Sequence, residues 1–282
     1  GHFVGLWRHD AEEAELRLRE RGEGPRAVRR FRGIDGALGE ALREVRVFEP
    51  RERPWYRVGL EAPAAGAWSP IYVDFKNGEL VVTRVRRVDG ADGTARGVVA
   101  TDLSLQAMTQ LMQSLRLPPE GVAMVVERDG GLIGLSRGTP VQRGEDDRPQ
   151  RLLATESGDA LVVAAFAAVV HDLDVQGDGG PRPEAGARRA DDLPARTTQT
   201  TLPDGESAQV AYARVRDPAG LDWLVVVAVP HEAVLRQPSP ALLLSAELPW
   251  IFAQAMGSPG YVGRHAEEAA LLALSRFVCL RA

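Results

Sequence analysis

The chain has 282 residues, of which 44% are hydrophobic and 26% are charged, and this is the composition of a globular protein with one large or two modest cores. It excludes a wholly disordered or collagen-like chain. The formal net charge of -5 argues against a polyanionic partner, so we expect no nucleic-acid partner, although nearly all the basic residues are arginine and Lys76 is the single lysine.

Disulfide and metal chemistry have little support in the sequence. Cys279 is the single cysteine, which excludes an internal disulfide framework and a cysteine-rich zinc site. The five histidines show no spacing with carboxylates that is typical of a metal site, so we expect neither a metal nor another cofactor. Because the chain begins without a methionine or a basic and then apolar leader, we interpret it as part of a longer protein.

The first 60 residues predict strands and then a short helix. Residues 1–8 and 13–19 have the short apolar or alternating pattern of half-exposed antiparallel strands. Residues 50–60 begin with a proline that suits a first helical turn, but Pro54 limits them to a short or broken helix. Between these elements we interpret four arginines as a solvated loop surface. They are Arg26, Arg29, Arg30 and Arg32.

A meander and a helix are expected next. Residues 67–75, 79–88 and 95–101 have strand character and are separated by turn signals rich in Asp, Asn and Gly, which predicts a three-stranded meander. The meander ends at Asp102. Apolar residues at helical spacing then predict a helix from about Leu103 until a pair of prolines stops it.

A second unit of similar order begins near residue 121. Residues 121–128 and 132–136 predict a hairpin, and residues 150–170 predict a weakly apolar helix. Strands over 207–216 and 221–229 close this unit. The economical interpretation is a mixed α/β (α+β) protein made of two modules, each with a meandering antiparallel sheet flanked by helices.

Two segments differ from the rest in composition. Residues 174–196 are dense in Gly, Pro and charge, and we interpret them as a mobile surface insertion. Residues 237–282 form a tail that we expect to be irregular. Up to residue 263 the single charge in this tail is Glu247, but four prolines and three glycines make this stretch a poor membrane span. Residues 265–280 favour a short amphipathic helix.

Three segments of the first half resemble a known family. They are Phe48-Glu49-Pro50-Arg51-Glu52-Arg53-Pro54-Trp55-Tyr56, Trp68-Ser69-Pro70-Ile71-Tyr72-Val73-Asp74 and Gly97-Val98-Val99-Ala100-Thr101-Asp102-Leu103-Ser104. This pattern resembles the membrane-distal half of a double Cache domain, the tandem PAS-like extracytoplasmic sensor module of bacterial transmembrane receptors. In the second half, VERDGGLIGLS and GLDWLVVVAVPHEAVL resemble the membrane-proximal module.

The resemblance covers residues 1–236 and implies a domain organisation. It places the membrane-distal, ligand-binding module at residues 1–116 and the membrane-proximal module at residues 117–236. Two features depart from the family, because the long helix expected before the first strand is absent and the tail after Arg236 does not look like the usual membrane helix.

Some family members that bind amino acids carry a recognisable set of residues. The set consists of an aromatic residue, an Arg-x-Trp-Tyr group, a tyrosine followed two residues later by an aspartate, and an aspartate at a strand end. The matching positions are Phe48, Arg53, Trp55, Tyr56, Tyr72, Asp74 and Asp102. The chemistry agrees, since an arginine fork can hold a carboxylate through two bonds and carboxylates can receive an ammonium group. The aromatic residues supply flat apolar walls and cation-π contacts.

The resemblance also implies a function and a location. It implies a sensor without catalysis of its own that binds a small-molecule ligand, an amino acid or amine, in the distal module and relays its state through the proximal module. It places the protein on the periplasmic, extracytoplasmic face of the bacterial inner membrane, attached through segments that this sequence lacks or has altered. In the intact receptor it implies a homodimer.

Structural interpretations of the same residues stay open. Trp55 and Tyr56 are also explained as core aromatics, Arg53 as the partner of a neighbouring carboxylate such as Asp74, and Asp102 as the N-cap of the helix that follows. A ligand-free structural or dimerisation module, or a Cache sensor for another ligand such as an organic acid, therefore remains an alternative.

A serine hydrolase is a remote alternative. Gly134-Leu135-Ser136-Arg137-Gly138 matches the G-x-S-x-G nucleophile pattern. In a hydrolase a helix follows the serine immediately, whereas here Thr139-Pro140 and a charged run follow, so we expect no catalysis at Ser136.

Overall fold

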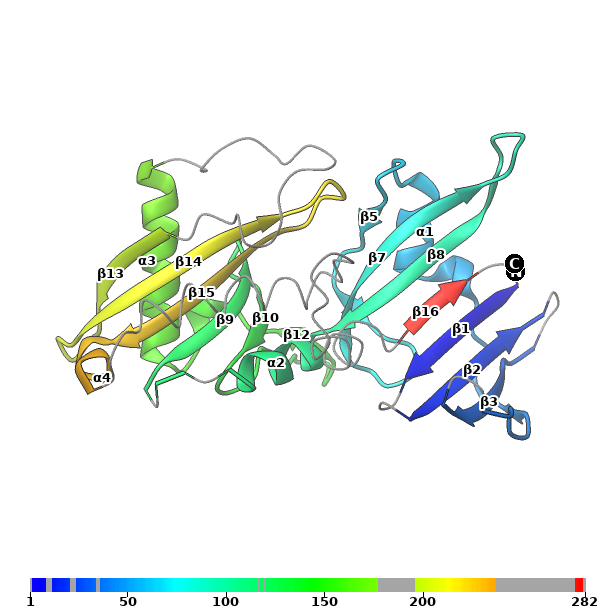
Figure 1. Ribbon diagram of the computed structural model, residues 1–282, viewed down its shortest axis with the longest axis horizontal. Helices are drawn as coiled ribbons and strands as arrows, with labels where there is room; N and C mark the ends of the chain where they lie inside the picture. The colour runs from blue at the N-terminus through cyan, green and yellow to red at the C-terminus, as the bar shows by residue number, and fades with distance from the viewer. Residues whose placement is uncertain are drawn as a thin grey trace. The chain divides into compact units, whose positions relative to one another are not determined.

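The computed structural model describes residues 2–8, 12–20, 24–33, 36–115, 117–118, 120–176, 196–236 and 277–280. The chain divides into two compact units (Figure 1), the first formed by Gly1–Ser104 with Gly257–Ala282 and the second by Leu105–Met256. Both units combine antiparallel sheets with a few helices. The predicted mixed α/β class is therefore confirmed.

The first unit is built on a nine-stranded sheet with the order β4-β3-β2-β1-β16-β8-β7-β5, in which β6 also pairs with β7. All of its strand pairs are antiparallel. The predicted strands over 1–8 and 13–19 are present, and the first strand predicted for the meander is split into two short ones. The strands are β1 (Phe3–Arg8), β2 (Glu13–Arg19), β3 (Ala27–Arg32), β4 (Leu42–Arg43), β5 (Ala67–Trp68), β6 (Tyr72–Val73), β7 (Leu80–Asp89), β8 (Ala95–Ser104) and β16 (Phe277–Leu280).

Two short helical segments pack against this sheet, as predicted. A 3-10 helix, Pro50–Glu52, is followed by α1, Pro54–Glu61. Each starts with a proline, whose fixed φ and missing N–H suit the first turn. Helix α1 approaches the sheet closely at Gly59, where a Cβ would collide with the side chain of Val98 on β8. The core between them contains Phe3, Trp7, Phe48, Trp55, Val85, Val98 and Ala100.

Strand β2 buries three of its four charged residues. Glu15, Arg17 and Arg19 are 3%, 0% and 8% exposed, whereas Leu16 and Leu18, which alternate with them, are only half-buried. Side chains alternate between the two faces of a strand, so the inward face of β2 is polar. Buried charges need partners, and the partners of this row contribute to the site described below.

Two expectations for this unit are wrong. The segment after β2 is strand β3 (Ala27–Arg32) rather than a loop, and the side chain of Arg26 beside it is buried, whereas Arg30 and Arg32 are exposed to solvent as expected. The end of the predicted helix over 265–280 is strand β16, which pairs with both β1 and β8. Its run of aromatic, β-branched and apolar residues suits a central strand. The rest of the predicted tail, residues 237–276, lies outside the described residues.

The helix predicted from Leu103 begins later. Strand β8 continues to Ser104, and α2 spans Leu105–Gln113. The interpretation of Asp102 as the N-cap of this helix is therefore wrong, because Asp102 is a strand residue whose side chain accepts a hydrogen bond from Thr83 on the neighbouring strand. Helix α2 belongs to the second unit, whereas the predicted boundary at residue 116 places it in the first module. The limits of the two modules stay a prediction.

The second unit has a five-stranded antiparallel sheet with the order β10-β9-β15-β14-β13 and a separate pair, β11 and β12. The predicted hairpin and the two predicted closing strands are confirmed. Strand β13 was not predicted, because its polar, threonine-rich sequence lacks an apolar alternation. The strands are β9 (Val122–Glu127), β10 (Leu132–Leu135), β11 (Val141–Arg143), β12 (Pro149–Arg151), β13 (Arg196–Thr201), β14 (Ser207–Arg216) and β15 (Asp222–Pro230).

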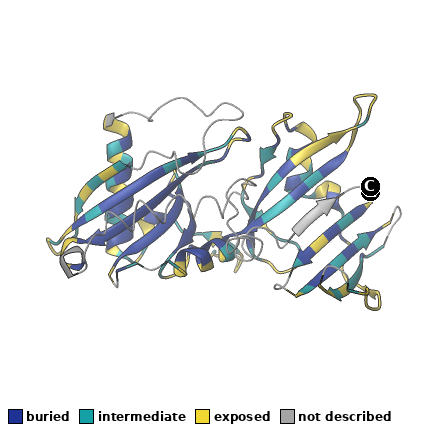
Figure 2. Cartoon of the chain, in the orientation of Figure 1, coloured by how far each residue is buried: buried dark blue, intermediate teal, exposed yellow. Residues whose placement is uncertain are grey.

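Helix α3, Ala160–Gln176, covers one face of this sheet and supplies about a third of the buried core residues. Strands β9, β14 and β15 are buried along most of their length (Figure 2). It starts later than the predicted helix over 150–170, because Pro149–Arg151 forms β12 and Ala154–Glu156 a 3-10 helix. Helix α4, His231–Arg236, follows β15. Most of the predicted insertion, residues 177–195, lies outside the described residues.

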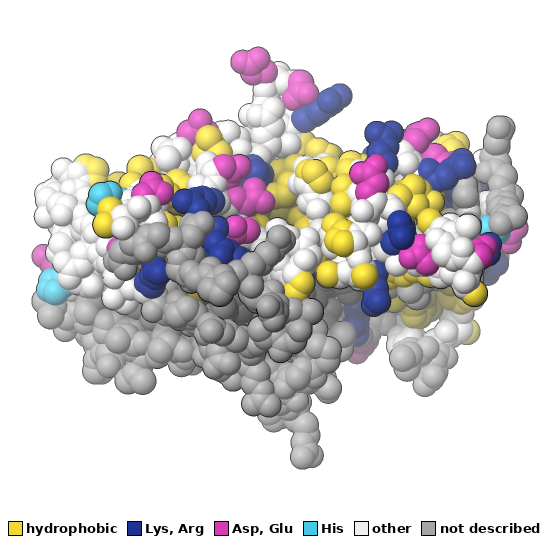
Figure 3. Space-filling view, turned by 90° about the horizontal axis from the view of Figure 1, so that it is seen from above, with side chains coloured by type: hydrophobic (Ala, Val, Ile, Leu, Met, Phe, Trp, Pro, Cys, Tyr) yellow, Lys and Arg dark blue, Asp and Glu magenta, His cyan; other side chains and the backbone are white. Residues whose placement is uncertain are grey.

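Two surface properties bear on function. Within the described ranges, no helix is both long and apolar enough to cross a membrane. On the face seen in Figure 3, the described acidic and basic side chains lie next to one another rather than in patches of a single sign.

Candidate functional site

A small cavity lies within the first unit. Its volume is about 10 Å³, which is room for about one water molecule. The walls come from strands β1, β2 and β8, from the start of α1, and from the turn that joins β6 to β7. The lining residues are Phe3, Arg17, Arg26, Phe48, Arg53, Trp55, Tyr72, Asp74, Phe75, Lys76, Ala100 and Asp102.

Six of the seven predicted site residues line this cavity. The exception is Tyr56, which packs edge-to-face on Trp55 with ring centroids 5.6 Å apart and contacts the core of the unit. Trp55 combines both interpretations offered for it, since it lines the cavity and is only 6% exposed within the core. Phe48 does the same at 5% exposure. The roles of these residues in binding remain a prediction.

Arg53 lies at the wall next to α1. It immediately precedes the helix in an extended conformation, its Nη2 donates to the carbonyl oxygen of Val73 at 2.9 Å, and its guanidinium lies 5.6 Å from the ring centroid of Tyr72. In the described part of the chain it forms no ion pair with Asp74. A guanidinium carries five N–H donors, so Arg53 has donors left for the carboxylate of a ligand.

A hydrogen-bonded row connects Tyr72 to Asp102. The Thr83 hydroxyl donates to Asp102 Oδ1 at 2.6 Å, and the Tyr72 hydroxyl is 2.8 Å from Thr83 Oγ1. Because the Thr83 hydrogen points to Asp102, Tyr72 is the donor to Thr83. Burial raises the pKa of Asp102 to about 7, and the negative charge of Asp74 adds to this effect while the hydrogen bond from Thr83 opposes it. Burial likewise raises the pKa of Tyr72.

Asp74 has a structural role in the turn after β6. Its Oδ2 accepts hydrogen bonds from the backbone N–H groups of Lys76 and Asn77, at 2.8 and 3.2 Å, in the manner of an Asx turn. Gly78 completes this turn with a φ of 72°, a conformation that suits glycine. Asp74 therefore fixes the turn that carries Lys76 to the cavity, while also lining the cavity itself.

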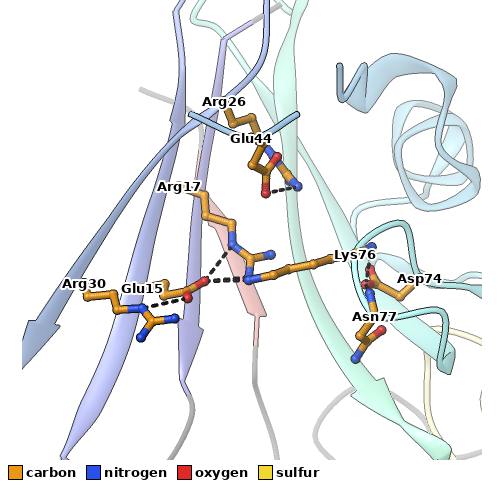
Figure 4. Close-up of polar contacts among 8 residues, drawn as sticks. All are labelled: Glu15, Arg17, Arg26, Arg30, Glu44, Asp74, Lys76 and Asn77. Atoms are coloured by element: carbon orange, nitrogen blue, oxygen red, sulfur yellow. Dashed lines mark hydrogen bonds and ion pairs between the residues drawn. The ribbon is translucent and has the colours of Figure 1, made fainter. Parts of the chain in front are cut away.

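The sequence analysis missed three cationic residues of the cavity, namely Arg17, Arg26 and Lys76. Glu15 Oε2 accepts hydrogen bonds from Arg17 Nη2 at 2.8 Å and from Lys76 Nζ at 2.7 Å (Figure 4). Burial opposes the ionisation of Glu15, but the hydrogen bonds from Lys76 and Arg17 outweigh it and lower the pKa to about 2. One signal was present in the sequence, because Glu15, Arg17 and Arg19 recur with the period of a strand.

Arg26 forms a buried ion pair with Glu44. Its Nε and Nη2 donate to the two carboxylate oxygens at 2.6 and 3.0 Å, and the guanidinium lies 3.9 Å from the ring centroid of Phe48. The side chains of Arg26 and Glu44 are 2% and 16% exposed. This pair connects the start of β3 with the segment after β4 and holds Phe48 at the cavity.

Replacing Glu44 by glutamine should lower the free energy of unfolding by about 3 kcal/mol, because the buried guanidinium of Arg26 would lose its counter-charge. Thermal or urea unfolding of the full chain measures this. The control is Glu40→Gln, at an exposed position nearby, which should stay within about 0.5 kcal/mol of the parent protein. Equal stability of the two variants would contradict a structural role for the pair.

Ser136 does not have the surroundings of a catalytic serine. It follows β10, its Oγ accepts a hydrogen bond from the backbone N–H of Ala123 at 2.8 Å, and the next element is strand β11 rather than a helix. The nucleophile elbow of a hydrolase needs a helix at this point. Across the described residues, no group of three or more His, Cys, Asp or Glu side chains could hold a metal ion.

Relatives in sequence are bacterial chemotaxis proteins. McpG of Pseudomonas putida is 31% identical over 86 residues, which are 30% of this chain and 13% of that protein. McpC of Bacillus subtilis is 24% identical over 111 residues, or 39% of this chain and 17% of that protein. The chain is similar to methyl-accepting chemotaxis proteins. It spans 13–17% of the length of the relatives it matches, and no family model matches it.

The solved structures that resemble the chain include chemoreceptor domains. The ligand-binding domain of PctB from Pseudomonas aeruginosa, in complex with L-Arg, has 18% identity and a TM-score of 0.42 over 84% of this chain and 74% of that chain. The ligand-binding domain of CtaA from Pseudomonas fluorescens, in complex with L-isoleucine, has 18% identity and a TM-score of 0.41 over 83% and 71%.

The methyl-accepting chemotaxis proteins bear on the predictions made from sequence. Chemotaxis proteins are bacterial receptors, so these relatives confirm the predicted resemblance to a bacterial receptor family. They are receptors rather than enzymes, which agrees with the expectation of a non-catalytic protein and gives the hydrolase alternative no support.

Proposed function

We propose that the chain is the ligand-binding sensor part of a bacterial chemotaxis-type receptor, and that the first unit binds a free amino acid or amine. The observation that carries this proposal is the composition of one cavity. It brings a guanidinium, Arg53, together with the carboxyl groups of Asp74 and Asp102 and the aromatic walls of Trp55 and Tyr72. A zwitterionic ligand needs both signs of charge within a few ångströms of each other.

Each end of such a ligand has a partner. The carboxylate binds the Arg53 fork through two charge-assisted hydrogen bonds. The ammonium group faces Asp102, whose carboxyl is aligned by Thr83 and Tyr72. Asp74 adds negative charge on the same side, and its backbone-bound turn keeps it there.

Binding of this ligand requires a change in the protein. An amino acid is several times larger than a water molecule, whereas the cavity holds about one. The walls therefore move apart or rearrange when a ligand enters. A ligand shifts the equilibrium between the closed and the rearranged cavity only if it binds the two arrangements with different affinity. A sensor transmits this shift as its signal.

The proposal includes the setting of the unit in a longer receptor. Residues 1–116 are the distal, ligand-binding module and residues 117–236 the proximal module that relays its state. The receptor lies in the bacterial inner membrane with this part on the periplasmic side, and it forms a homodimer. The similarity to chemotaxis proteins supports this setting.

A thermal-shift screen of the full chain against amino acids, small amines and organic acids tests the proposal. A ligand that binds only the folded state raises the unfolding temperature by mass action. At 100 times its Kd it adds about 2.7 kcal/mol, which corresponds to roughly 5 °C or more for a chain of this size. We expect amino acids or amines to give such shifts. A folded protein that no amino acid or amine stabilises would overturn the proposal.

A ligand-free structural module is the second candidate. The small cavity and the low exposure of Phe48 and Trp55 favour it, because both rings fill the core of the unit. This candidate predicts that none of the screened metabolites raises the unfolding temperature, so the same experiment decides between the two.

A further inference from the structure

The lining of the cavity has a buried part and a half-buried part. Phe3, Arg26 and Phe48 line the cavity and are buried. Arg53 and Asp74 line the same cavity and are half-buried. Protein interiors are closely packed and yield little, so a ligand that needs more room gains it at the half-buried part of the wall.

The side chain of Arg26 fills the aromatic region of the buried part. Its guanidinium carbon lies 3.9 Å from the ring centroid of Phe48, 5.2 Å from that of Phe3 and 5.7 Å from that of Phe75. The ring of Phe48 in turn contacts Phe3 and Phe75 edge-to-face, with centroids 4.9 and 5.1 Å apart. The cavity that these residues line has room for about one water molecule. The three rings therefore leave no space for a further apolar group beside the guanidinium.

Two kinds of contact hold Arg26 in this place. Its Nε and Nη2 donate to the two carboxylate oxygens of Glu44 at 2.6 and 3.0 Å, a two-bond pair of fixed geometry (Figure 4). The aromatic rings attract the same cation. Separating this buried pair would leave two charges without their counter-charge, which is costly. Arg26 therefore resists displacement by a ligand.

The proposed contacts of the ligand head group direct its side chain toward this region. The carboxylate is assigned to Arg53 and the ammonium group to Asp102, and the phenylalanine rings are apolar lining that neither contact uses. Phe75 connects the two regions, because its ring centroid lies 5.8 Å from the guanidinium carbon of Arg53 and 5.7 Å from that of Arg26. A bulky side chain that followed this apolar wall would collide with Arg26.

We infer that Arg26 determines the specificity of the cavity and limits its ligands to amino acids with a small side chain, such as glycine, alanine or serine. This inference rests on the proposed function, because it takes Arg53 and Asp102 as the partners of the head group. The half-buried part of the wall gives room to the head group, whereas the buried part gives none to a large side chain.

Titration calorimetry of the full chain with amino acids of increasing size tests the inference. We expect at least one of glycine, L-alanine and L-serine to bind about tenfold or more tightly than each of L-leucine, L-phenylalanine and L-glutamate. The physical reason is that extra methylene groups forced into a packed site displace its walls. L-glutamate is included because its side-chain carboxylate would favour binding if Arg26 acted as a partner of the ligand rather than as a filler.

Two double variants separate the volume of Arg26 from its charge. Arg26→Ala with Glu44→Gln opens the aromatic region and removes both charges together, so that neither stays buried without its partner. In this variant we expect the ratio of the affinities for L-leucine and L-alanine to rise about tenfold or more. Arg26→Met with Glu44→Gln is the matched control, because methionine keeps a long unbranched side chain that fills the same region. It should keep the ratio of the parent protein.

The outcomes separate this inference from the proposed function. L-leucine, L-phenylalanine or L-glutamate that binds the parent protein as tightly as the small amino acids overturns the inference but leaves the proposed amino-acid sensor intact. An alanine variant that binds ligands with the unchanged preference of the parent protein overturns it as well. If the alanine variant does not fold, the ligand series on the parent protein still decides. Failure of every amino acid and amine to bind overturns the proposed function itself.

Discussion

Arg53→Ala should weaken the binding of an amino acid by about 100-fold or more. Its guanidinium is the proposed partner of the ligand carboxylate, and loss of one partner of a hydrogen-bonded charge pair typically costs about 2–5 kcal/mol. Arg53→Lys keeps the charge but loses the planar fork, so it should restore only part of the affinity. Titration calorimetry with the best ligand of the thermal-shift screen measures all three proteins.

Arg57 offers a matched control on the same helix. It lies one turn along α1 with an exposed side chain and does not line the cavity. Arg57→Ala should therefore bind the ligand with the affinity of the parent protein. If both alanine variants lose affinity equally, the effect belongs to the helix as a whole, and the assignment of Arg53 to the ligand carboxylate fails.

The affinity for a ligand with an ammonium group should fall about tenfold when the pH is lowered from 8 to 6. The cause is Asp102, whose pKa burial raises to about 7. Below that pH the carboxyl is protonated and must lose its proton to pair with the ammonium group. The affinity for the ligand therefore falls by close to a factor of ten for every further pH unit. Calorimetry in buffers with different ionisation enthalpies should detect the proton that is released on binding.

Asp102→Asn removes the titrating group and keeps the shape of the side chain. We expect this variant to bind weakly and with almost no dependence on pH between 6 and 8. The same substitution affects folding in the opposite sense. A carboxyl whose pKa is higher in the folded than in the unfolded chain makes the protein less stable as pH rises from about 4 to 7. The variant should lose this part of the pH dependence of unfolding.

Elements with local signals could be predicted from the sequence. The hairpin of β9 and β10 has an Asp-Gly-Gly turn between two apolar runs, and Pro50, at the start of the 3-10 helix, marks a first helical turn. Elements that depend on distant partners could not. The arginine-rich strand β3 pairs with β2 and β4 on its two sides, and Glu44, after β4, neutralises Arg26 just before it. Strand β16 pairs with strands from the opposite part of the chain.

The candidate site shows the same division. The resemblance to the sensor family, carried over position by position, predicted six of the residues that line the cavity. It missed Lys76 and Arg17, because their meeting at Glu15 joins residues 61 positions apart. Thr83 was missed for another reason. A threonine in a strand is typical of any sheet, and only the structure shows its hydroxyl between Tyr72 and Asp102.

The single lysine makes the cavity accessible to spectroscopy. Lys76 is at the cavity wall with its side chain 36% exposed, and no other lysine occurs in the 282 residues. Reductive methylation with ¹³C-formaldehyde would therefore add one labelled dimethylamine at this wall and one at the amino terminus. The chemical shift of the lysine resonance would report occupancy of the cavity without an engineered residue. It would do so also in mixtures of ligands, whose binding heats overlap in calorimetry.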